Sequence, residues 1–188
     1  MEIRFATEHD VAGIHEVYAP VVEDTAISFE TVPPSREELA QRVARTMPRY
    51  PWLVATDARV LGYAYAHRFA ERAAYEWSVE TSIYVRDTAR GQRVGSTLYR
   101  ALLTLLAAQG YRQAYAGIAL PNPASVGLHQ ALGFEHVGTY RDVGFKFERW
   151  HDVGWWQRAL TEDAVVPRTP VPVDELDAPV VERALSGI

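Results

Sequence analysis

The chain has 188 residues, of which 48% are hydrophobic and 23% charged, and its formal net charge is −5. This is the length and composition of one ordinary globular domain. The absence of cysteine excludes disulfides, thiolate catalysis and cysteine-ligated zinc or iron–sulfur sites. No apolar run approaches the roughly 20 residues that span a bilayer, and no secretory signal is visible. We therefore expect a cytoplasmic protein with no membrane partner.

The negative charge is concentrated at the end of the chain. Residues 161–188 hold six acidic and two basic side chains, or −4, which leaves −1 of the −5 for the other 160 residues. The body of the protein is therefore near neutral, and no broad positive field favours nucleic acid. A local exception is a group of four arginines within fifteen residues: Arg86, Arg90, Arg93 and Arg100.

Hydrophobic periodicity predicts the order β-α-α-β-β-β-α-β-α-β-β, which indicates an α/β (α+β) fold with a mixed sheet layered with helices. The expected strands are 2–6, 52–56, 60–68, 77–85, 114–120, 136–146 and 153–160. The expected helices run from about Thr7 to Pro20, from a capping box at Ser35, from Gly95 to about Gln109, and over 124–132.

The last 28 residues differ in composition from the rest. They contain four prolines (Pro167, Pro170, Pro172 and Pro179) and few large apolar side chains. Such a segment favours an extended or partly ordered arm over a second domain. We therefore expect one domain over 1–160 and a Pro-rich acidic tail over 161–188.

A glycine-containing turn at residues 90–96 links a predicted strand to a predicted helix. Free amides at a helix start, together with the helix dipole, bind phosphate groups. The turn, Arg-Gly-Gln-Arg-Val-Gly-Ser, is neither a dinucleotide-binding GxGxxG motif nor a Walker sequence. Taken alone it indicates phosphate binding or an ordinary structural loop.

The segment 85–99 resembles the acetyl-CoA-binding motif of the GNAT acetyltransferase superfamily, [R/Q]-x-x-G-x-[G/A]. The segment 120–134, Leu-Pro-Asn-Pro through Leu-Gly-Phe, resembles the next motif of that superfamily. Further segments resemble the branch of phosphinothricin and methionine sulfoximine N-acetyltransferases: 50–55, 62–66, 79–85 and 150–154. The resemblance covers about residues 2–160 and does not include the tail.

The resemblance implies a GNAT fold, with a mostly antiparallel sheet of about seven strands flanked by about four helices. It also implies acetyl-CoA as co-substrate, with no metal, and a homodimer in which the strands around 144–150 contribute to the interface. The residues it places at acetyl-CoA are Ile83, Tyr84, Val85, Arg90, Gly91, Arg93, Val94, Gly95, Ser96, Asn122 and Ser125. Position 93 departs from the motif, because arginine replaces a glycine that lets the backbone approach the pyrophosphate. This arginine could crowd the phosphate or add a bond to it.

Acetyl transfer to an amine needs a base for the ammonium proton and a donor for the tetrahedral oxyanion. The resemblance assigns the base to Glu80, which interrupts an apolar strand, and the alternative is a solvated strand glutamate. His129 occupies the place of the usual tyrosine acid. It could act as acid, assist Glu80, or only pack beside the cofactor.

For the substrate, the resemblance implies a small amino acid whose carboxylate is held by Arg72 with Ser82 and Tyr84, while Tyr75 and Phe29 shape the pocket. Arg72 could instead be an ordinary surface arginine. Two other functions stay open: a non-catalytic acetyl-CoA sensor, suggested by Arg93, and an acetyltransferase for peptide N-termini, lysines or polyamines. A polyamine site should be acidic, so Arg72 argues against polyamines.

Overall fold

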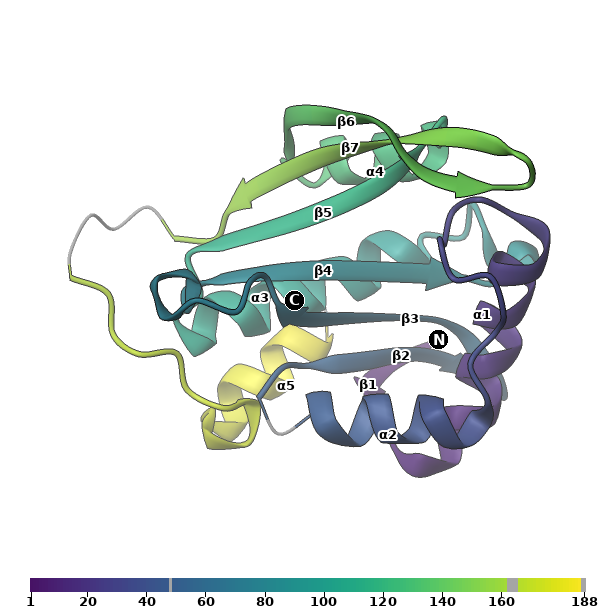
Figure 1. Cartoon of the computed structure of the whole chain (residues 1–188). Helices are drawn as coiled ribbons and strands as arrows, with labels where there is room; N and C mark the ends of the chain where they lie inside the picture. Colours follow the sequence, from purple (N-terminus) through teal and green to yellow (C-terminus); the bar gives the residue numbers. More distant parts are fainter. Residues whose placement is uncertain (48, 162–165, 187–188) are drawn as a thin grey trace.

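The computed structural model describes residues 1–47, 49–161 and 166–186. One seven-stranded sheet with the order β1-β2-β3-β4-β5-β7-β6 forms its centre (Figure 1). The strands are β1 (Glu2–Phe5), β2 (Trp52–Asp57), β3 (Arg59–Arg68), β4 (Ser78–Val85), β5 (Gln113–Leu120), β6 (Glu135–Lys146) and β7 (Arg149–Ala159). Neighbouring strands are antiparallel except β4 and β5, which are parallel. The predicted mixed, mostly antiparallel sheet is confirmed.

Five α-helices are described, one more than the sequence predicts. They are α1 (Val11–Asp24), α2 (Arg36–Thr46), α3 (Val94–Gln109), α4 (Pro123–Ala131) and α5 (Ala178–Ser186). Short 3-10 turns occur at η1 (Glu8–Asp10), η2 (Ala73–Tyr75), η3 (Asp87–Ala89) and η4 (Val173–Glu175). The capping box predicted at the start of α2 is present, with the Ser35 amide donating to Glu38 Oε2 at 2.7 Å and the Glu38 amide donating to Ser35 Oγ at 3.2 Å.

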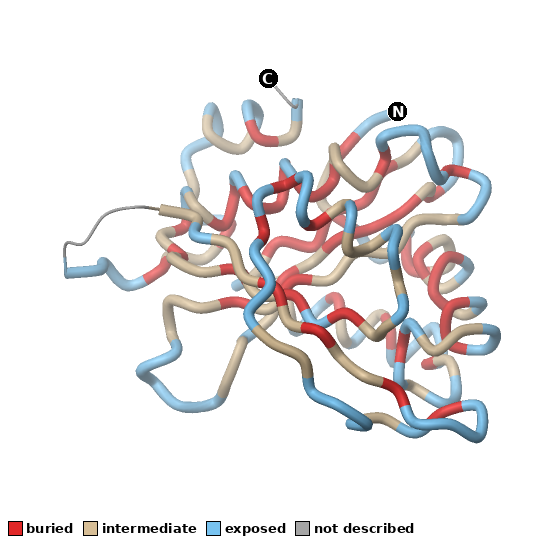
Figure 2. The backbone as a smooth tube through the Cα atoms, turned by 90° about the horizontal axis from the view of Figure 1, so that it is seen from above, coloured by how far each residue is buried: buried red, intermediate tan, exposed pale blue. Residues whose placement is uncertain are grey.

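The two faces of the sheet carry separate hydrophobic clusters, because side chains alternate along a strand. In β2, Trp52 and Val54 pack with α1 and α2, whereas Leu53 and Ala55 belong to the cluster around α3 and α5. Buried segments accordingly run through the middle of the molecule and exposed ones lie at its rim (Figure 2). Burial of these apolar faces fixes which helices cover which side of the sheet.

Helix α1 does not end at Pro20, so that part of the prediction is wrong. It continues to Asp24 with Pro20 inside it. A proline in a helix interior removes one hydrogen bond and costs about 3 kcal/mol. Val21 and Val22 are buried beyond it, at 8% and 1% exposure, and burial of such side chains offsets a cost of this size.

The end of the chain contains a helix where the sequence predicts an extended or partly ordered arm. Helix α5 packs against α3 and β1, and Ala184 is only 4% exposed. Upstream of it, Trp77 Nε1 donates to the Arg168 carbonyl at 2.7 Å, and Gln109 Nε2 donates to the Val171 carbonyl at 2.8 Å. The amphipathic pattern of α5 was missed because the four prolines dominate the composition of this segment. The helix covers an apolar surface of α3.

Candidate active site

Strands β4 and β5 pair for only three residues and then separate. Their last register pair is Glu80 with Tyr115, although β4 continues paired with β3 to Val85 and β5 continues paired with β7 to Leu120. The two strands therefore diverge beyond Glu80, as Figure 1 shows. This divergence opens the sheet at its centre and places Glu80 at the point where the opening begins.

A tight turn joins η3 to α3 beside this opening. Two of its residues have left-handed backbones, Gly91 at φ 74° and Arg93 at φ 64°. Arg93 is the N-cap of α3, so arginine adopts the conformation for which glycine is better suited, at a cost of roughly 1–2 kcal/mol. The amides of residues 94–96 are left without acceptors inside the helix.

All eleven residues predicted to bind acetyl-CoA line one cavity of about 330 Å³. Those residues are Ile83, Tyr84, Val85, Arg90, Gly91, Arg93, Val94, Gly95, Ser96, Asn122 and Ser125. The volume is in the usual range for cofactor pockets. Arg93 and the N-terminus of a 16-residue helix favour an anion there, whereas Arg90, also at the cavity, is paired with Asp87 at 2.7 Å. The cavity therefore fits an anionic ligand with an apolar portion, as a phosphate-bearing thioester is.

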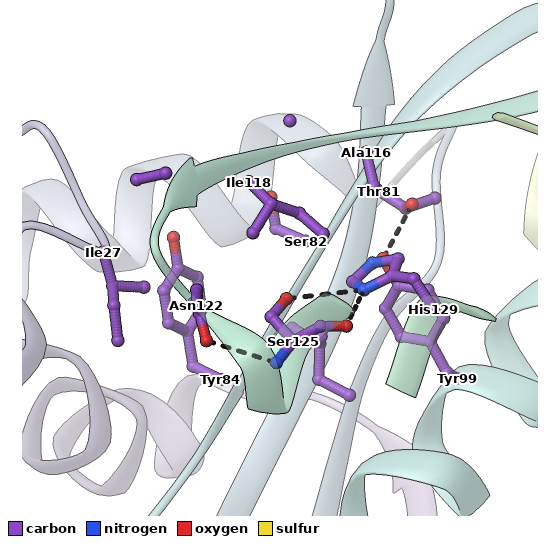
Figure 3. A pocket seen from close by; sticks show the side chains of 13 residues that line it. Ile27, Thr81, Ser82, Tyr84, Tyr99, Ala116, Ile118, Asn122, Ser125 and His129 are labelled. Carbon is purple, nitrogen blue, oxygen red and sulfur yellow. Dashed lines mark hydrogen bonds between the residues drawn. The ribbon is translucent and has the colours of Figure 1, made fainter. Parts of the chain in front are cut away.

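A smaller cavity lies between the diverging strands (Figure 3). Its walls come from residues 81–84 of β4, residues 116–119 of β5, and Asn122, Ser125 and His129. Asn122 caps α4, with its Oδ1 accepting from the Ser125 amide at 3.2 Å. Ile27, Ile83, Tyr84, Asn122 and Ser125 border both cavities, so the two are neighbouring spaces.

His129 is 2% exposed and both of its ring nitrogens have partners (Figure 3). Nδ1 lies 2.7 Å from the Ser125 carbonyl oxygen, and Nε2 lies 3.0 Å from Tyr99 Oη. Tyr99 Oη donates to Thr81 Oγ1 at 2.8 Å, and Thr81 Oγ1 donates to the Tyr115 carbonyl at 3.0 Å. The imidazole is therefore one end of a buried chain of hydrogen bonds that reaches β5.

Every contact in this chain of hydrogen bonds has a proton only when the imidazole is doubly protonated. Each hydroxyl has a single proton, and the Ser125 carbonyl can only accept, so Tyr99 and Ser125 both require an N–H from His129. Burial lowers the pKa of His129, although the Ser125 carbonyl partly offsets this by favouring the charged form. The neutral ring leaves one contact without a proton, and protonation would complete the chain.

Glu80 and the His129 chain lie on opposite faces of β4, because Glu80 and Thr81 are consecutive strand residues. Glu80 shares its face with His67, its register partner on β3. Burial raises the pKa of the Glu80 carboxyl, and the charge of His67 opposes this rise. The two predicted catalytic side chains therefore lie on different sides of β4, where His129 borders the smaller cavity and Glu80 borders neither cavity.

The residues predicted to bind substrate are distributed over three elements. Ser82 and Tyr84 lie on β4, and both border the smaller cavity. Arg72 and Tyr75 lie exposed in the β3–β4 connection, and Phe29 lies in the α1–α2 connection with 38% exposure. These three border neither cavity.

Some residues of the site were not predicted from the sequence. Val21, Ile27, Ala89, Ala124 and Leu128 also line the larger cavity. Helical spacing offered a signal for the last two, because Ala124, Ser125 and Leu128 recur at one face of α4. Tyr99 follows Ser96 by one helical turn, and its hydroxyl reaches His129. Ile27 carries no such signal, because it is one apolar residue in an irregular loop.

No group of three or more His, Asp or Glu side chains could hold a metal ion within residues 1–47, 49–161 and 166–186. Over the same residues, every helix is too short or too polar to cross a membrane.

Residues 3–155 match the sequence profile of the family described as acetyltransferase (GNAT) domain. Phosphinothricin N-acetyltransferase of Streptomyces viridochromogenes is 42% identical over 174 residues, which cover 92% of this chain and 93% of that protein. An L-methionine sulfoximine/L-methionine sulfone acetyltransferase of Pseudomonas paraeruginosa is 39% identical over 171 residues, or 88% of this chain and 98% of that one. A crystal structure of a GNAT superfamily phosphinothricin acetyltransferase from Sinorhizobium meliloti, in complex with AcCoA, has a TM-score of 0.86 at 39% identity. It covers 93% of this chain and 96% of its own.

Proposed function

Because the chain belongs to the GNAT acetyltransferase domain family, we propose that it acetylates the α-amine of phosphinothricin, methionine sulfoximine or a similar small amino acid. The protein is an acetyl-CoA-dependent N-acetyltransferase, as its curated relatives are. The observation that carries the proposal is the single cavity formed by the eleven predicted acetyl-CoA residues, which adjoins the smaller cavity between β4 and β5, the two strands that separate beyond Glu80.

The phosphates of acetyl-CoA would bind at the turn before α3. The amides of residues 94–96 and the dipole of α3 both favour an anion there. Arg90 and Arg93 border the same cavity and supply charge-assisted hydrogen bonds. Asn122 and Ser125, at the start of α4, line the part of the cavity that continues toward the opening between the strands, where the thioester would lie.

Glu80 would accept the proton of the ammonium group as the amine attacks the thioester carbonyl. Its position where β4 and β5 separate brings it to the edge of the opening. Its raised pKa brings the carboxylate closer in basicity to an amine, which suits a general base. The oxyanion would be held by a main-chain amide near Val85 on β4.

His129, on the α3 side of the opening, would serve as a second acceptor for a proton of the attacking amine. It borders the smaller cavity, and one added proton completes its contacts with Ser125 and Tyr99. The neutral ring favoured by burial is poorly suited to donate a proton. This arrangement supports an accepting role for His129 over the acid role of the usual tyrosine.

A thiol-release assay with acetyl-CoA over a panel of amines tests the proposal. Turnover should be fastest with phosphinothricin, methionine sulfoximine or methionine sulfone. Faster turnover with peptide N-termini, lysines or polyamines would replace the substrate assignment. Binding of acetyl-CoA by calorimetry without turnover on any amine would identify a sensor and overturn the enzymatic proposal.

Replacing Arg93 with glycine separates backbone strain from phosphate binding. Glycine adopts φ 64° without strain, so the free energy of unfolding should rise by about 1 kcal/mol in urea denaturation. Loss of a charge-assisted hydrogen bond should raise the Kd for acetyl-CoA about 10-fold in calorimetry. Arg93→Asn is the matched control, because asparagine tolerates this backbone and also lacks the charge. Tighter binding by Arg93→Gly would mean that the arginine obstructs the phosphate.

We also propose that the protein is a homodimer assembled through the β6–β7 hairpin. β6 is an edge strand of the sheet, and exposed edges invite pairing. Six large apolar side chains of the hairpin are 49–60% exposed: Val137, Tyr140, Val143, Phe145, Phe147 and Trp150. An apolar surface of this kind marks an interaction site.

Charge introduced into this hairpin should produce monomers. We expect Phe145→Glu combined with Trp150→Glu to halve the mass measured by light scattering, because two buried carboxylates would oppose association. Val166→Glu, at an apolar position that is 87% exposed outside the hairpin, is the control and should leave the mass unchanged. A monomeric wild-type protein would contradict the proposal directly.

A further inference from the structure

The β6–β7 hairpin ends in a buried cation. Lys146, the only lysine in the sequence, is the last residue of β6 and is 7% exposed. The two residues after it, Phe147 and Glu148, both have left-handed backbones, which close a two-residue hairpin. A register shift between Tyr140 and Gly144 bends β6 just before this point. The bend and the turn together fix where the ammonium group lies.

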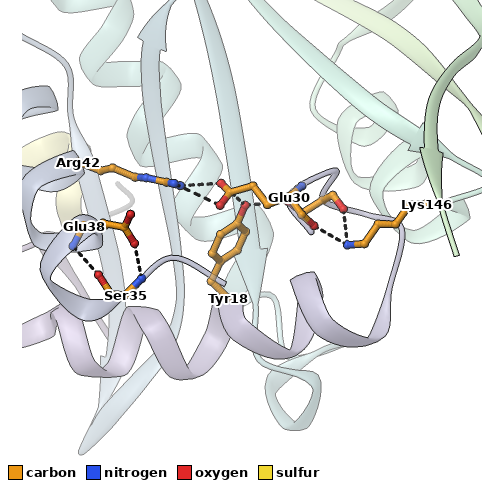
Figure 4. Close-up of polar contacts among 7 residues, drawn as sticks. Tyr18, Glu30, Ser35, Glu38, Arg42 and Lys146 are labelled. Atoms are coloured by element: carbon orange, nitrogen blue, oxygen red, sulfur yellow. Dashed lines mark hydrogen bonds and ion pairs between the residues drawn. The ribbon is translucent and has the colours of Figure 1, made fainter. Parts of the chain in front are cut away.

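All three protons of the Lys146 ammonium are used by main-chain carbonyls. Nζ donates to the Val22 carbonyl at 2.6 Å, to the Ser28 carbonyl at 2.8 Å and to the Glu30 carbonyl at 2.7 Å. Figure 4 shows the Lys146 ammonium group pointing toward the connection that carries Glu30. Val22 lies in the last turn of α1, whose free carbonyls attract a cation. Lys146 thus joins the helix end to the connection that follows it.

A second set of contacts anchors the same connection from α2. The Glu30 carboxylate accepts from Arg42 Nη1 at 2.6 Å and Nη2 at 3.2 Å, and from Tyr18 Oη at 3.0 Å (Figure 4). Tyr18 Oη also lies 2.8 Å from Ser28 Oγ. The Glu30 carboxylate is therefore satisfied by Arg42 and Tyr18, while Lys146 holds the main chain.

The residues between these anchors face the two cavities and the hairpin. Ile27 borders both cavities, so its position sets part of the wall where they meet. Phe29 packs over Gly144, where an added Cβ would lie 2.1 Å from the Phe29 ring, and its ring centre is 6.1 Å from that of His151. The α1–α2 connection has no regular secondary structure between Thr25 and Pro34, so its shape depends on such contacts.

We propose that Lys146 is a positioning residue for acetyl transfer, which holds the α1–α2 connection, and with it Ile27, as a fixed wall of the two cavities. The inference rests on the proposed function, because the substrates that this wall would contact are acetyl-CoA and the amine. Lys146 itself borders neither cavity. It acts on substrate binding through the main chain of residues 22–30.

The three hydrogen bonds of the Lys146 ammonium group indicate that this residue positions the main chain and does not only fill space. A buried ammonium is costly unless its protons are bonded, and an apolar side chain in the same place often gives equal or greater stability. An apolar residue, however, cannot select one arrangement of three carbonyls. The bonds of Lys146 are therefore suited to specifying a single conformation of an otherwise irregular segment.

Lys146→Met keeps the length of the side chain and removes its donors. If the connection then spends only about a tenth of its time in the native conformation, the Kd for acetyl-CoA should rise about 10-fold, and so should the KM for the amine when acetyl-CoA is kept below saturation. The kcat at saturation should change less than about threefold, because bound substrate restores the wall. Hydrogen exchange over residues 25–34 should become faster. Arg45→Met removes an exposed cation from α2 and should change none of these quantities.

The absence of cysteine allows a chemical rescue at this one position. Lys146→Cys can be alkylated with 2-bromoethylamine in the unfolded chain and refolded, which restores an ammonium group with sulfur in place of one methylene. The modified protein should recover the native KM, Kd and exchange rates, whereas the unmodified thiol should not. Should Lys146→Met fail to fold, Lys146→Gln keeps two N–H donors and should show the same changes at smaller size.

The outcomes distinguish this inference from the proposed function. Unchanged KM, Kd and hydrogen exchange in a folded Lys146→Met protein with a lower Tm would reduce Lys146 to a stabilising residue and overturn the inference. A wild-type protein that binds acetyl-CoA but acetylates no amine would overturn the proposed function. In that case the Kd for acetyl-CoA and the exchange rates still decide the role of Lys146.

Discussion

Replacing Glu80 with glutamine is expected to lower kcat at least ~100-fold, the usual size of a general-base contribution. Glutamine keeps the shape of the side chain but cannot accept the ammonium proton. The Kd for acetyl-CoA should change little, because Glu80 does not border the larger cavity. Steady-state kinetics on the best amine, with calorimetry for acetyl-CoA, measures both. The neighbouring Ser78→Ala, two residues earlier on β4, is a control for disturbance of the strand.

The pH dependence of the wild-type enzyme tests whether Glu80 acts as the base. The active form of the base is the carboxylate, and burial raises the pKa of Glu80 above the ordinary glutamate value of 4.5. Activity should therefore be lost as the pH falls through a pKa higher than 4.5. Glu80→Gln should lack this step, while keeping the dependence that comes from the amine itself. Nearly unchanged kcat in the variant, or the same acid limb in both proteins, would contradict a catalytic role.

The fold could be predicted from the sequence where local signals agreed with burial. The capping box at Ser35, the apolar stripe of α3 and the alternation in β4 each indicated an element that is present. The errors lie where tertiary contacts outweigh local preference. Pro20 remains helical because the residues after it are buried, and α5 forms on a surface provided by α3 and β1.

The site residues that lie in short sequence motifs could be predicted, whereas the contacts between distant parts of the chain could not. All eleven predicted cavity residues lie in three short segments with recognisable patterns: the end of β4, the turn before α3 and the start of α4. The placement of Glu80 and His129 on opposite sides of β4 follows from the alternation of Glu80 and Thr81 along the strand and from the Tyr99 hydroxyl, which joins Thr81 to His129. The bonds of Lys146 join residues 116 to 124 positions apart, and no sequence pattern indicates them.

Arg72 is the proposed carboxylate clamp, and its surroundings leave it available for that role. It lies exposed at the N-cap of η2, in the β3–β4 connection that leads to Glu80. Among the described residues it forms no ion pair, whereas nearby Arg68 and Arg49 are paired with Glu71 and Glu76. A planar guanidinium without a carboxylate partner can bind both oxygens of an amino-acid substrate.

Arg72→Ala should therefore raise the KM for amino-acid substrates about 30-fold, the effect of losing charge-assisted hydrogen bonds worth about 2 kcal/mol. The kcat should fall much less, since the carboxylate is bound alike in the ground state and the transition state. Arg68→Ala removes an exposed arginine at the end of β3, next to the same connection, and should leave KM near its wild-type value. The decisive comparison uses an amine that lacks the carboxylate. Its kcat/KM should be low with the wild type and insensitive to Arg72→Ala, because the clamp has nothing to bind. An equal loss on both substrates would show that Arg72 shapes the connection and does not hold the carboxylate.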